Sequence, residues 1–380
     1  MKDLAMKLDR LNAKNLFRSR RILSSSQEIE PTIDGKKVLS FCSNDYLGLA
    51  NHEKVKQAFL DAVEKYGVGS GASHLVTGHH KYHAALEDEL ANFLGCEKVL
   101  LFSTGYMANL GTVSALATRD SELFLDKLNH ASLNDAAIQS RANLKRFAHQ
   151  DLNHLKSLLS SSDKSSRLIL SDGVFSMDGT VAPITQLQDI AAKNKSQLII
   201  DDAHGVGVLG AHGKGSTEGL LDDKTILIGT LGKAFGTFGA FVAAKQETIE
   251  WLIQRAHSYI YTTALPPAIA EAARISLHII QEEPWRRTKL QELVDYFRNC
   301  CEQMDINLTN SQTPIQPIIV GASDNSMKLS SALLENLILV PAIRPPTVPD
   351  GSARLRVTFC SNHTKKHIEK LVEALNQKPK

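Results

Sequence analysis

Residues 225–236 read TILIGTLGKAFG, an apolar run that passes into a lysine framed by glycines. A continuous apolar run of this kind is typical of a buried parallel strand. Most lysines lie on the solvated surface of a protein. Lys233 instead follows the end of a strand in a Gly-rich turn, a place that proteins often use for cofactors. The stretch therefore predicts a sheet with a functional site at its edge.

Six further segments are candidate strands, most of them continuous apolar runs of the same kind, and helical patterns separate several of them. The runs are KVLLF (98–102), ELFLD (122–126), LKRFA (144–148), RLILS (167–171), QLIID (197–201) and GAFVAA (239–244). Helical periodicity is found at 80–94, 152–159 and 184–193. Strands alternating with helices predict a mostly parallel α/β sheet with both faces covered.

The chain has 380 residues, enough for a large core and more than one domain. We expect an N-terminal helix and extended arm over 1–50, a large α/β domain over 51–284, and a small C-terminal α+β domain over 285–380. The net charge of +2 offers no basic face for nucleic acid, so small-molecule chemistry is favoured.

The cysteines and the N-terminus bear on where the protein works. Five cysteines without CxxC spacing do not suggest a disulfide framework. The sequence shows neither the apolar core of a signal peptide nor a run of about 20 apolar residues. We therefore expect a cytoplasmic protein.

Polar residues stand at the ends of four of the runs: FSTGYMAN (102–109), GVFSMDG (173–179), DDAH (201–204) and TLGK (230–233). In the first, a strand turns through glycine into a helix, whose N-terminal N–H groups suit a phosphate. In the third, Asp201 ends a buried strand and needs a partner, since an unpaired buried carboxylate is costly. A protonated ring nitrogen would be such a partner.

Other readings of these motifs are weaker. GVGVLG (205–210) matches GxGxxG, but a dinucleotide fingerprint should open a helix directly after the strand. A P-loop would need a glycine where Leu227 stands. His79, His80 and His83 have helical spacing that suits a metal, but with no acidic or thiol partner nearby we expect a solvated helix start and no metal.

A lysine, an acid, a histidine and phosphate-binding turns on neighbouring strand ends fit pyridoxal phosphate. The lysine forms a Schiff base with the aldehyde of this cofactor, and an aspartate keeps the pyridine nitrogen protonated so that the ring withdraws electrons. A lysine in a largely apolar site loses proton affinity and becomes a usable nucleophile and base. We therefore expect Lys233 to be buried.

At these residues the sequence resembles the α-oxoamine synthases, fold-type-I pyridoxal-phosphate enzymes related in fold to aspartate aminotransferase. The matching segments span nearly the whole chain: SNDYLGL (43–49), GSGAS (69–73), DKLNHASL (126–133), GVFSMDG (173–179), DDAHGVGVLG (201–210) and TLGKAFG (230–236). The resemblance implies condensation of an amino acid with an acyl thioester and loss of carbon dioxide.

The tail AIRPPTVP (342–349) with ARLR (353–356), and RFAHQDLNHL (146–155), are similar to the biotin-pathway branch of this family. That branch implies L-alanine and a pimeloyl thioester as substrates, with either coenzyme A or acyl-carrier protein as the carrier. A sister branch that uses glycine and acetyl-CoA is the alternative. A cofactor-free binding protein and a nucleotide-binding enzyme are further alternatives from other classes.

The resemblance also implies roles for single residues. Lys233 would attach the cofactor and move the Cα proton, Asp201 would bind the ring nitrogen, and His204 the ring oxygen. His130 would stack on the ring and contact substrate. The other cofactor contacts would be Gly105, Tyr106, Ser176 and Thr230, with Thr262 or Thr263 reaching a phosphate across a homodimer interface. The substrate contacts would be Arg18, Asn44, Thr347 and Arg356; for Arg18 an exposed helix charge is the alternative.

Overall fold

The computed structural model describes residues 2–376. They form two compact units. Unit 1 takes in the residues up to 48, residues 177–180 and those from 288, and unit 2 consists of residues 49–176 and 181–287. The expected division into three parts at residues 50 and 284 stays a prediction.

Unit 2 is an α/β unit built on one seven-stranded sheet. Its strands are β4 (Lys98–Phe102), β5 (Glu122–Asp126), β6 (Asn143–Phe147), β7 (Arg167–Asp172), β8 (Gln197–Asp201), β9 (Thr225–Thr230) and β10 (Ala240–Ala244). Its helices are α2 (Glu53–Tyr66), the π-helix η1 (His74–Gly78), α3 (Lys81–Leu94), α4 (Gly105–Leu116), α5 (Ala131–Ser140), α6 (Leu152–Ser160), α7 (Ile184–Lys193), α8 (Gln246–Arg255), α9 (His257–Ile260) and α10 (Pro267–Glu282).

The strand order is β4-β10-β9-β8-β7-β5-β6. β10 runs antiparallel to both of its neighbours, and the other four pairs are parallel. The sheet is therefore mostly parallel, as the apolar runs predict. The carboxyl ends of β5, β7, β8 and β9 consequently meet at one edge of the sheet, where ligands bind in folds of this type.

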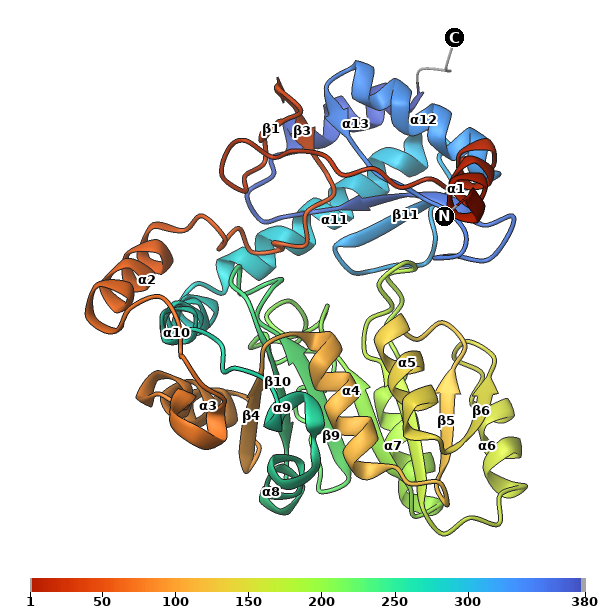
Figure 1. The fold of residues 1–380 in the computed structure, drawn as a ribbon. Coiled ribbons are helices and arrows are strands. Elements are labelled where there is room, and N and C mark those ends of the chain that lie inside the picture. The colour runs from red at the N-terminus through yellow and green to blue at the C-terminus, as the bar shows by residue number, and fades with distance from the viewer. Residues whose placement is uncertain (1, 377–380) are drawn as a thin grey trace. The chain divides into compact units, whose positions relative to one another are not determined.

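Helices cover both faces of the sheet. Leu168 and Leu170 of β7 pack in one hydrophobic cluster with Val113 of α4 and Leu133 of α5, and α4 and α5 lie across this face in Figure 1. Ile169 alternates to the opposite face, where it is also fully buried. Burial on both faces explains why the strands are apolar without alternation.

Unit 1 contains a three-stranded antiparallel sheet of β11 (Ile315–Gly321), β14 (Ala353–Thr358) and β13 (Ala342–Ile343). The short strands β3 (Leu39–Ser40) and β12 (Ile338–Leu339) pair in parallel, and β1 (Thr32–Ile33) pairs with β2 (Lys36–Lys37). Its helices are α1 (Lys2–Ala13), α12 (Ser323–Glu335), α13 (Lys365–Asn376) and most of α11 (Trp285–Gln303). The β3–β12 pairing ties the N-terminal arm to the C-terminal region within this unit.

Candidate active site

A cavity of about 230 Å³ lies at the carboxyl edge of the sheet in unit 2. Every residue that lines it belongs to this unit: Gly105, Tyr106, His130, Ser132, Asp172, Val174, Ser176, Asp201, Ala203, His204, Thr230 and Lys233. The structure thus brings together eight residues predicted from the sequence. These are Gly105, Tyr106, His130, Ser176, Asp201, His204, Thr230 and Lys233.

Lys233 follows β9, and its Nζ lies 2.9 Å from Nε2 of His204. His204, three residues after the end of β8, is buried. Lys233 was expected to be buried, but it is only partly buried, because its side chain lines the open cavity. An ammonium donor and an imidazole lone pair at this distance can share a proton.

Glycines shape the turn that carries Lys233. Gly236 has a φ of +66°, and a Cβ built there would lie 2.3 Å from the main-chain nitrogen of Ala50. A side chain at Gly229 would lie 2.2 Å from the ring of Phe241. The flanking glycines thus allow the loop to pack closely against the rest of unit 2.

Asp201 ends β8 and is buried in the cavity wall. Its Oδ2 accepts a hydrogen bond of 2.6 Å from Nδ2 of Asn109, and its Oδ1 accepts one of 3.1 Å from the N–H of Ala203. The sequence interpretation did not identify Asn109. A buried asparagine in a helix of small and apolar residues is a signal that could have found it, since such a side chain needs a partner.

His130 caps the N-terminus of α5 and is anchored at both its main chain and its ring. Its N–H donates to both carboxylate oxygens of Asp172, at 3.0 and 3.2 Å. Its Nδ1 lies 2.7 Å from Oγ of Ser132. Burial lowers the pKa of His130; Asp201 acts in the opposite direction, and Lys233 lowers the pKa further. The ring is therefore neutral near pH 7.

Asp172 was also missed by the sequence interpretation, although it ends a buried strand as Asp201 does. The two residues are partners in the ladder between β7 and β8. Burial raises the pKa of Asp172 well above its ordinary value, and the neighbouring charge of Asp201 raises it further. Two acidic side chains thus stand side by side at the cavity.

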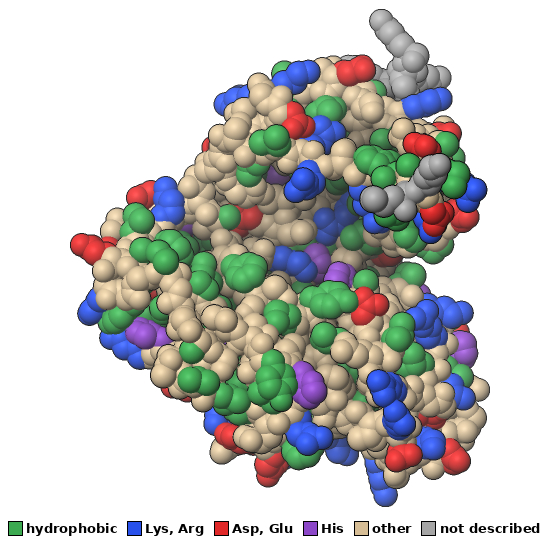
Figure 2. Space-filling model, in the orientation of Figure 1, with side chains coloured by type: hydrophobic (Ala, Val, Ile, Leu, Met, Phe, Trp, Pro, Cys, Tyr) green, Lys and Arg blue, Asp and Glu red, His purple; other side chains and the backbone are tan. Residues whose placement is uncertain are grey.

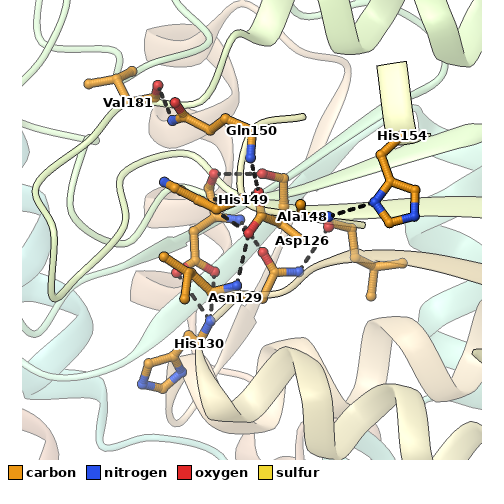
Figure 3. Close-up of polar contacts among 12 residues, drawn as sticks. Asp126, Asn129, His130, Ala148, His149, Gln150, His154 and Val181 are labelled. Carbon is orange, nitrogen blue, oxygen red and sulfur yellow. Dashed lines mark hydrogen bonds and ion pairs between the residues drawn. The ribbon is translucent and has the colours of Figure 1, made fainter. Parts of the chain in front are cut away.

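A second polar cluster supports the loop that carries His130 (Figure 3). The carboxylate of Asp126 accepts the N–H groups of Leu128 and Gln150, each at 2.8 Å, and lies 3.1 Å from Nδ1 of His149. These bonds join the loop after β5 to the loop after β6. The His149 ring also meets Phe175 edge-on at 4.3 Å. The RFAHQDLNHL segment therefore packs against Phe175, whose neighbours Val174 and Ser176 line the cavity.

The N-terminus of α4 supplies donors for an anion. α4 begins at Gly105, and Oγ1 of its N-cap Thr104 accepts the N–H of Met107 at 3.1 Å. The first N–H groups of a helix have no acceptor within it, so those of Gly105 and Tyr106 suit a phosphate. An amine, a strand-end carboxylate and a helix N-terminus in one cavity are the groups that pyridoxal phosphate requires. The residues present therefore fit the predicted cofactor.

The other predicted residues do not line this cavity. Thr262 and Thr263 lie between α9 and α10, where Thr263 forms a bridge with Ser73. The four predicted substrate residues belong to unit 1 and form two contacts there. Nη1 of Arg356 donates to Oδ1 of Asn44 at 3.3 Å. Nη2 of Arg18 donates to Oγ1 of Thr347 at 3.4 Å.

Of the three histidines considered for a metal, His83 differs from the expected solvated helix start, whereas His79 is exposed and His80 is the N-cap of α3. His83 is fully buried, and both of its ring nitrogens bond main-chain groups, namely the N–H of His80 and the carbonyl of Leu265. Nδ1 of His79 lies 2.9 Å from Nδ1 of His74. His83 is buried because its position on α3 faces the interior, where its ring satisfies the N–H of His80 and the carbonyl of Leu265.

Residues 36–375 match the family model described as aminotransferase class I and II. The chain is 50% identical over 375 residues to the 8-amino-7-oxononanoate synthase of Nitrosococcus oceani, covering 98% of this chain and 100% of that protein.

Solved structures with the same fold include a serine palmitoyltransferase from S. paucimobilis with bound PLP. It has a TM-score of 0.93 and 28% identity, covering 98% of this chain and 96% of that chain. The 8-amino-7-oxononanoate synthase from Francisella tularensis has a TM-score of 0.78 and 34% identity, covering 90% of this chain and 97% of that chain.

Proposed function

The chain belongs to the aminotransferase class I and II family, and from this premise we propose that it condenses L-alanine with a pimeloyl thioester in biotin biosynthesis. The products are 8-amino-7-oxononanoate, carbon dioxide and the free carrier. The protein is a pyridoxal-phosphate-dependent acyltransferase of fold type I. The relative from Nitrosococcus oceani, matched over its whole length, favours this reaction over the sister reaction with glycine and acetyl-CoA.

The single observation that carries the proposal is the meeting of Lys233, His204 and Asp201 in one cavity. Bound pyridoxal phosphate supplies an aldehyde that captures amines and a ring that withdraws electrons from the captured amino acid. The protein's own groups must then bind this cofactor, orient the two substrates and move protons.

We assign the proton transfers to Lys233. Its Nζ removes the proton from Cα of alanine and later returns one. His204, 2.9 Å from Nζ, accepts a hydrogen bond from the amine and binds the ring oxygen of the cofactor. Asp201 accepts a hydrogen bond from the protonated ring nitrogen, and its carboxylate charge keeps that nitrogen protonated.

The remaining residues bind and orient. The N–H groups of Gly105 and Tyr106, with Thr230, would bind the phosphate, and Ser176 would hydrogen-bond the cofactor. His130 stacks on the ring and contacts substrate. Arg356 and Asn44 bind the carboxylate of alanine, because a guanidinium grips a carboxylate with two parallel bonds. Arg18 and Thr347 bind the acyl substrate.

The proposal includes a homodimer in which Thr262 or Thr263 contacts the phosphate across the interface. Large hydrophobic side chains are exposed on unit 2, among them Leu60, Val76 and Tyr261, and Figure 2 shows hydrophobic side chains at the surface over α2. Exposed apolar groups of this size are typical of protein–protein contacts.

The proposal places the enzyme in the cytoplasm. All five cysteines are free thiols, as expected in a reducing compartment. Among the described residues, no helix is both long and apolar enough to cross a membrane.

The decisive experiment is a paired assay of the purified protein with pyridoxal phosphate. Alanine is offered with pimeloyl-CoA or with pimeloyl acyl-carrier protein, and glycine is offered with acetyl-CoA. We expect 8-amino-7-oxononanoate, detected by mass spectrometry, and at least 100-fold lower kcat/KM with the glycine pair, roughly the discrimination that hydrophobic pockets reach. A preference for the glycine pair, or a protein that stays colourless with the cofactor, contradicts the proposal.

A further inference from the structure

A chain of buried hydrogen bonds links Asp201 to His130 within unit 2. Nδ2 of Asn109 lies 2.6 Å from Oδ2 of Asp201 and 2.7 Å from Oγ of Ser132. Oγ of Ser132 lies 2.7 Å from Nδ1 of His130. Asn109 and Ser132 are at most 1% exposed, so water does not compete for these bonds. Neither residue has a role in the proposed function so far.

The carboxylate fixes the direction of the first bonds. An ionised carboxylate only accepts hydrogen bonds, so the Asn109 group that faces Asp201 must be the amide nitrogen. The opposite amide orientation would bring two oxygens within 2.6 Å of each other. The same nitrogen has a second hydrogen, which it donates to Oγ of Ser132. Oδ1 of Asn109 consequently has no hydrogen-bond partner among the described residues.

The remaining bonds fix the state of the histidine ring. Oγ of Ser132 accepts from Asn109 with one of its lone pairs, which leaves its hydroxyl proton available for Nδ1 of His130, 2.7 Å away. The main-chain N–H of Ser132 points at the same nitrogen, at 3.3 Å. Two donors thus converge on Nδ1, which must hold a lone pair. In a neutral imidazole the proton is then on Nε2.

We infer that Asn109 and Ser132 are positioning residues that hold His130 in the tautomer with its proton on Nε2. His130 then faces the cavity as a hydrogen-bond donor and not as a base. Burial, which lowers the pKa of His130, keeps the ring neutral and agrees with this assignment. The catalytic consequence rests on the proposed function: a donor at this position orients a substrate oxygen, while Lys233 moves the proton.

The tautomer can be read directly by NMR. We would label the histidines with 15N, record the holoenzyme at pH 7, and assign His130 by the signals that disappear in His130→Gln. We expect a protonated Nε2 and an unprotonated Nδ1. A protonated Nδ1, on its own or together with Nε2, overturns the inference.

Substitution of Ser132 tests the chain of bonds. Ser132→Ala removes the hydroxyl, and we expect a several-fold fall in kcat, the equivalent of about one net hydrogen bond, with part of His130 shifting to the other tautomer. Ser132→Thr keeps the hydroxyl and should restore the wild-type NMR signature. Ser140→Ala is the matched control, because Ser140 lies on the same helix and its hydroxyl bonds main-chain groups outside the chain of bonds, the carbonyl of Ala137 and the N–H of Ala142. An unchanged tautomer and unchanged kcat in Ser132→Ala contradict the inference.

Failure of the inference and failure of the proposed function give different results. If wild-type enzyme makes no 8-amino-7-oxononanoate while Nε2 of His130 is protonated, the proposed reaction fails and the positioning chain stands. If the product forms while Nδ1 carries the proton, the reaction stands and the inference fails. For variants, circular dichroism and cofactor content measured beside the NMR spectra separate misfolding from a change of tautomer.

Discussion

Asp172 accepts the main-chain N–H of His130 with both of its carboxylate oxygens, at 3.0 and 3.2 Å. The bond joins the end of β7 to the start of α5, two places that are 42 residues apart in the sequence. The N–H of Asp172 in turn donates to Oδ1 of Asn129, next to His130. The main chain at His130 is thus held in place independently of its ring.

Replacing Asp172 should therefore damage both stability and activity. In Asp172→Ala the buried N–H of His130 loses its acceptor, and we expect the free energy of unfolding to fall by about 1–3 kcal/mol. Urea denaturation measures this loss, and steady-state kinetics should show a lower kcat. Asp151→Ala is the control, because Asp151 caps α6 outside the cavity and its loss should cost about 1 kcal/mol without a change in kcat. Equal kinetic effects in the two variants would contradict a special role for Asp172.

Lys233→Ala should abolish turnover and the visible absorbance of the enzyme-bound cofactor. The variant lacks the amine that we propose attaches the cofactor and moves the proton, and proton transfer alone accounts for about 100-fold to 10,000-fold in rate. The absorbance spectrum and kcat are the measurements. Lys224→Ala, which changes an exposed lysine just before β9, should resemble the wild type. A Lys233→Ala protein that kept the visible band would refute the assignment.

The sequence predicts the structure best where the residues of a segment by themselves indicate its conformation. The expected runs of unit 2 are strands with bounds within one residue of those expected. Apart from the edge strand β6, they are almost wholly buried, and a strand buried on both faces must be apolar throughout. Lys233 and Asp201 could be predicted because Asp201 ends such a run and Lys233 lies in the turn that follows one. Their side chains meet in one cavity because parallel strands end at the same edge of the sheet.

The residues that sequence reasoning missed act through distant partners. Asn109 contacts Asp201, which is 92 positions away, and Asp172 contacts His130, which is 42 positions away. The local signals, a polar residue in an apolar helix and an acid at the end of a buried strand, show that each side chain needs a partner but do not show which residue that partner is. His83 was placed wrongly for a similar reason, since its acceptor is the carbonyl of Leu265, which lies 182 residues away.

Gly236→Ala should be much more damaging than Gly232→Ala in the loop that carries Lys233. The Cβ at position 236 would meet the Ala50 main chain at 2.3 Å, and its φ of +66° is strained for alanine. At position 232 the nearest atom would be 3.6 Å away. For Gly236→Ala we expect the free energy of unfolding, measured with urea, to fall by at least about 2 kcal/mol. Backbone strain alone accounts for about 1–2 kcal/mol, and the clash with Ala50 adds to it. Gly232→Ala should lose less than about 1 kcal/mol. Similar losses in the two variants would show that close packing of the loop is not what requires Gly236.

We expect Asp202, which lies next to Asp201 in the sequence, to make the stability of unit 2 depend on pH. Its side chain is fully buried, and Oδ2 accepts the N–H of Ser216 at 2.7 Å. A Cβ at Gly205 or Gly215 would lie 2.1 Å from one of its carboxylate oxygens, so these glycines leave room for the group. Burial raises the pKa of Asp202 to about 7.

The sign follows from where the proton is bound. Between about pH 4 and pH 7 the folded protein keeps the proton of Asp202 while the unfolded chain has released it. The contribution of Asp202 to stability is therefore present in full at low pH and is lost as the pH rises to 7. Each pH unit in this window costs about 1.4 kcal/mol.

Asp202→Asn removes this dependence, because a neutral amide does not titrate. The free energy of unfolding of the variant minus that of the wild type should rise by about 1 kcal/mol per pH unit from pH 5 to pH 7 and level off above it. Urea unfolding at pH 5, 6, 7 and 8 measures the difference. Asp120→Asn, at an exposed turn, should give a difference that does not change with pH. A flat difference for Asp202→Asn would mean that the buried carboxyl is already ionised at pH 5.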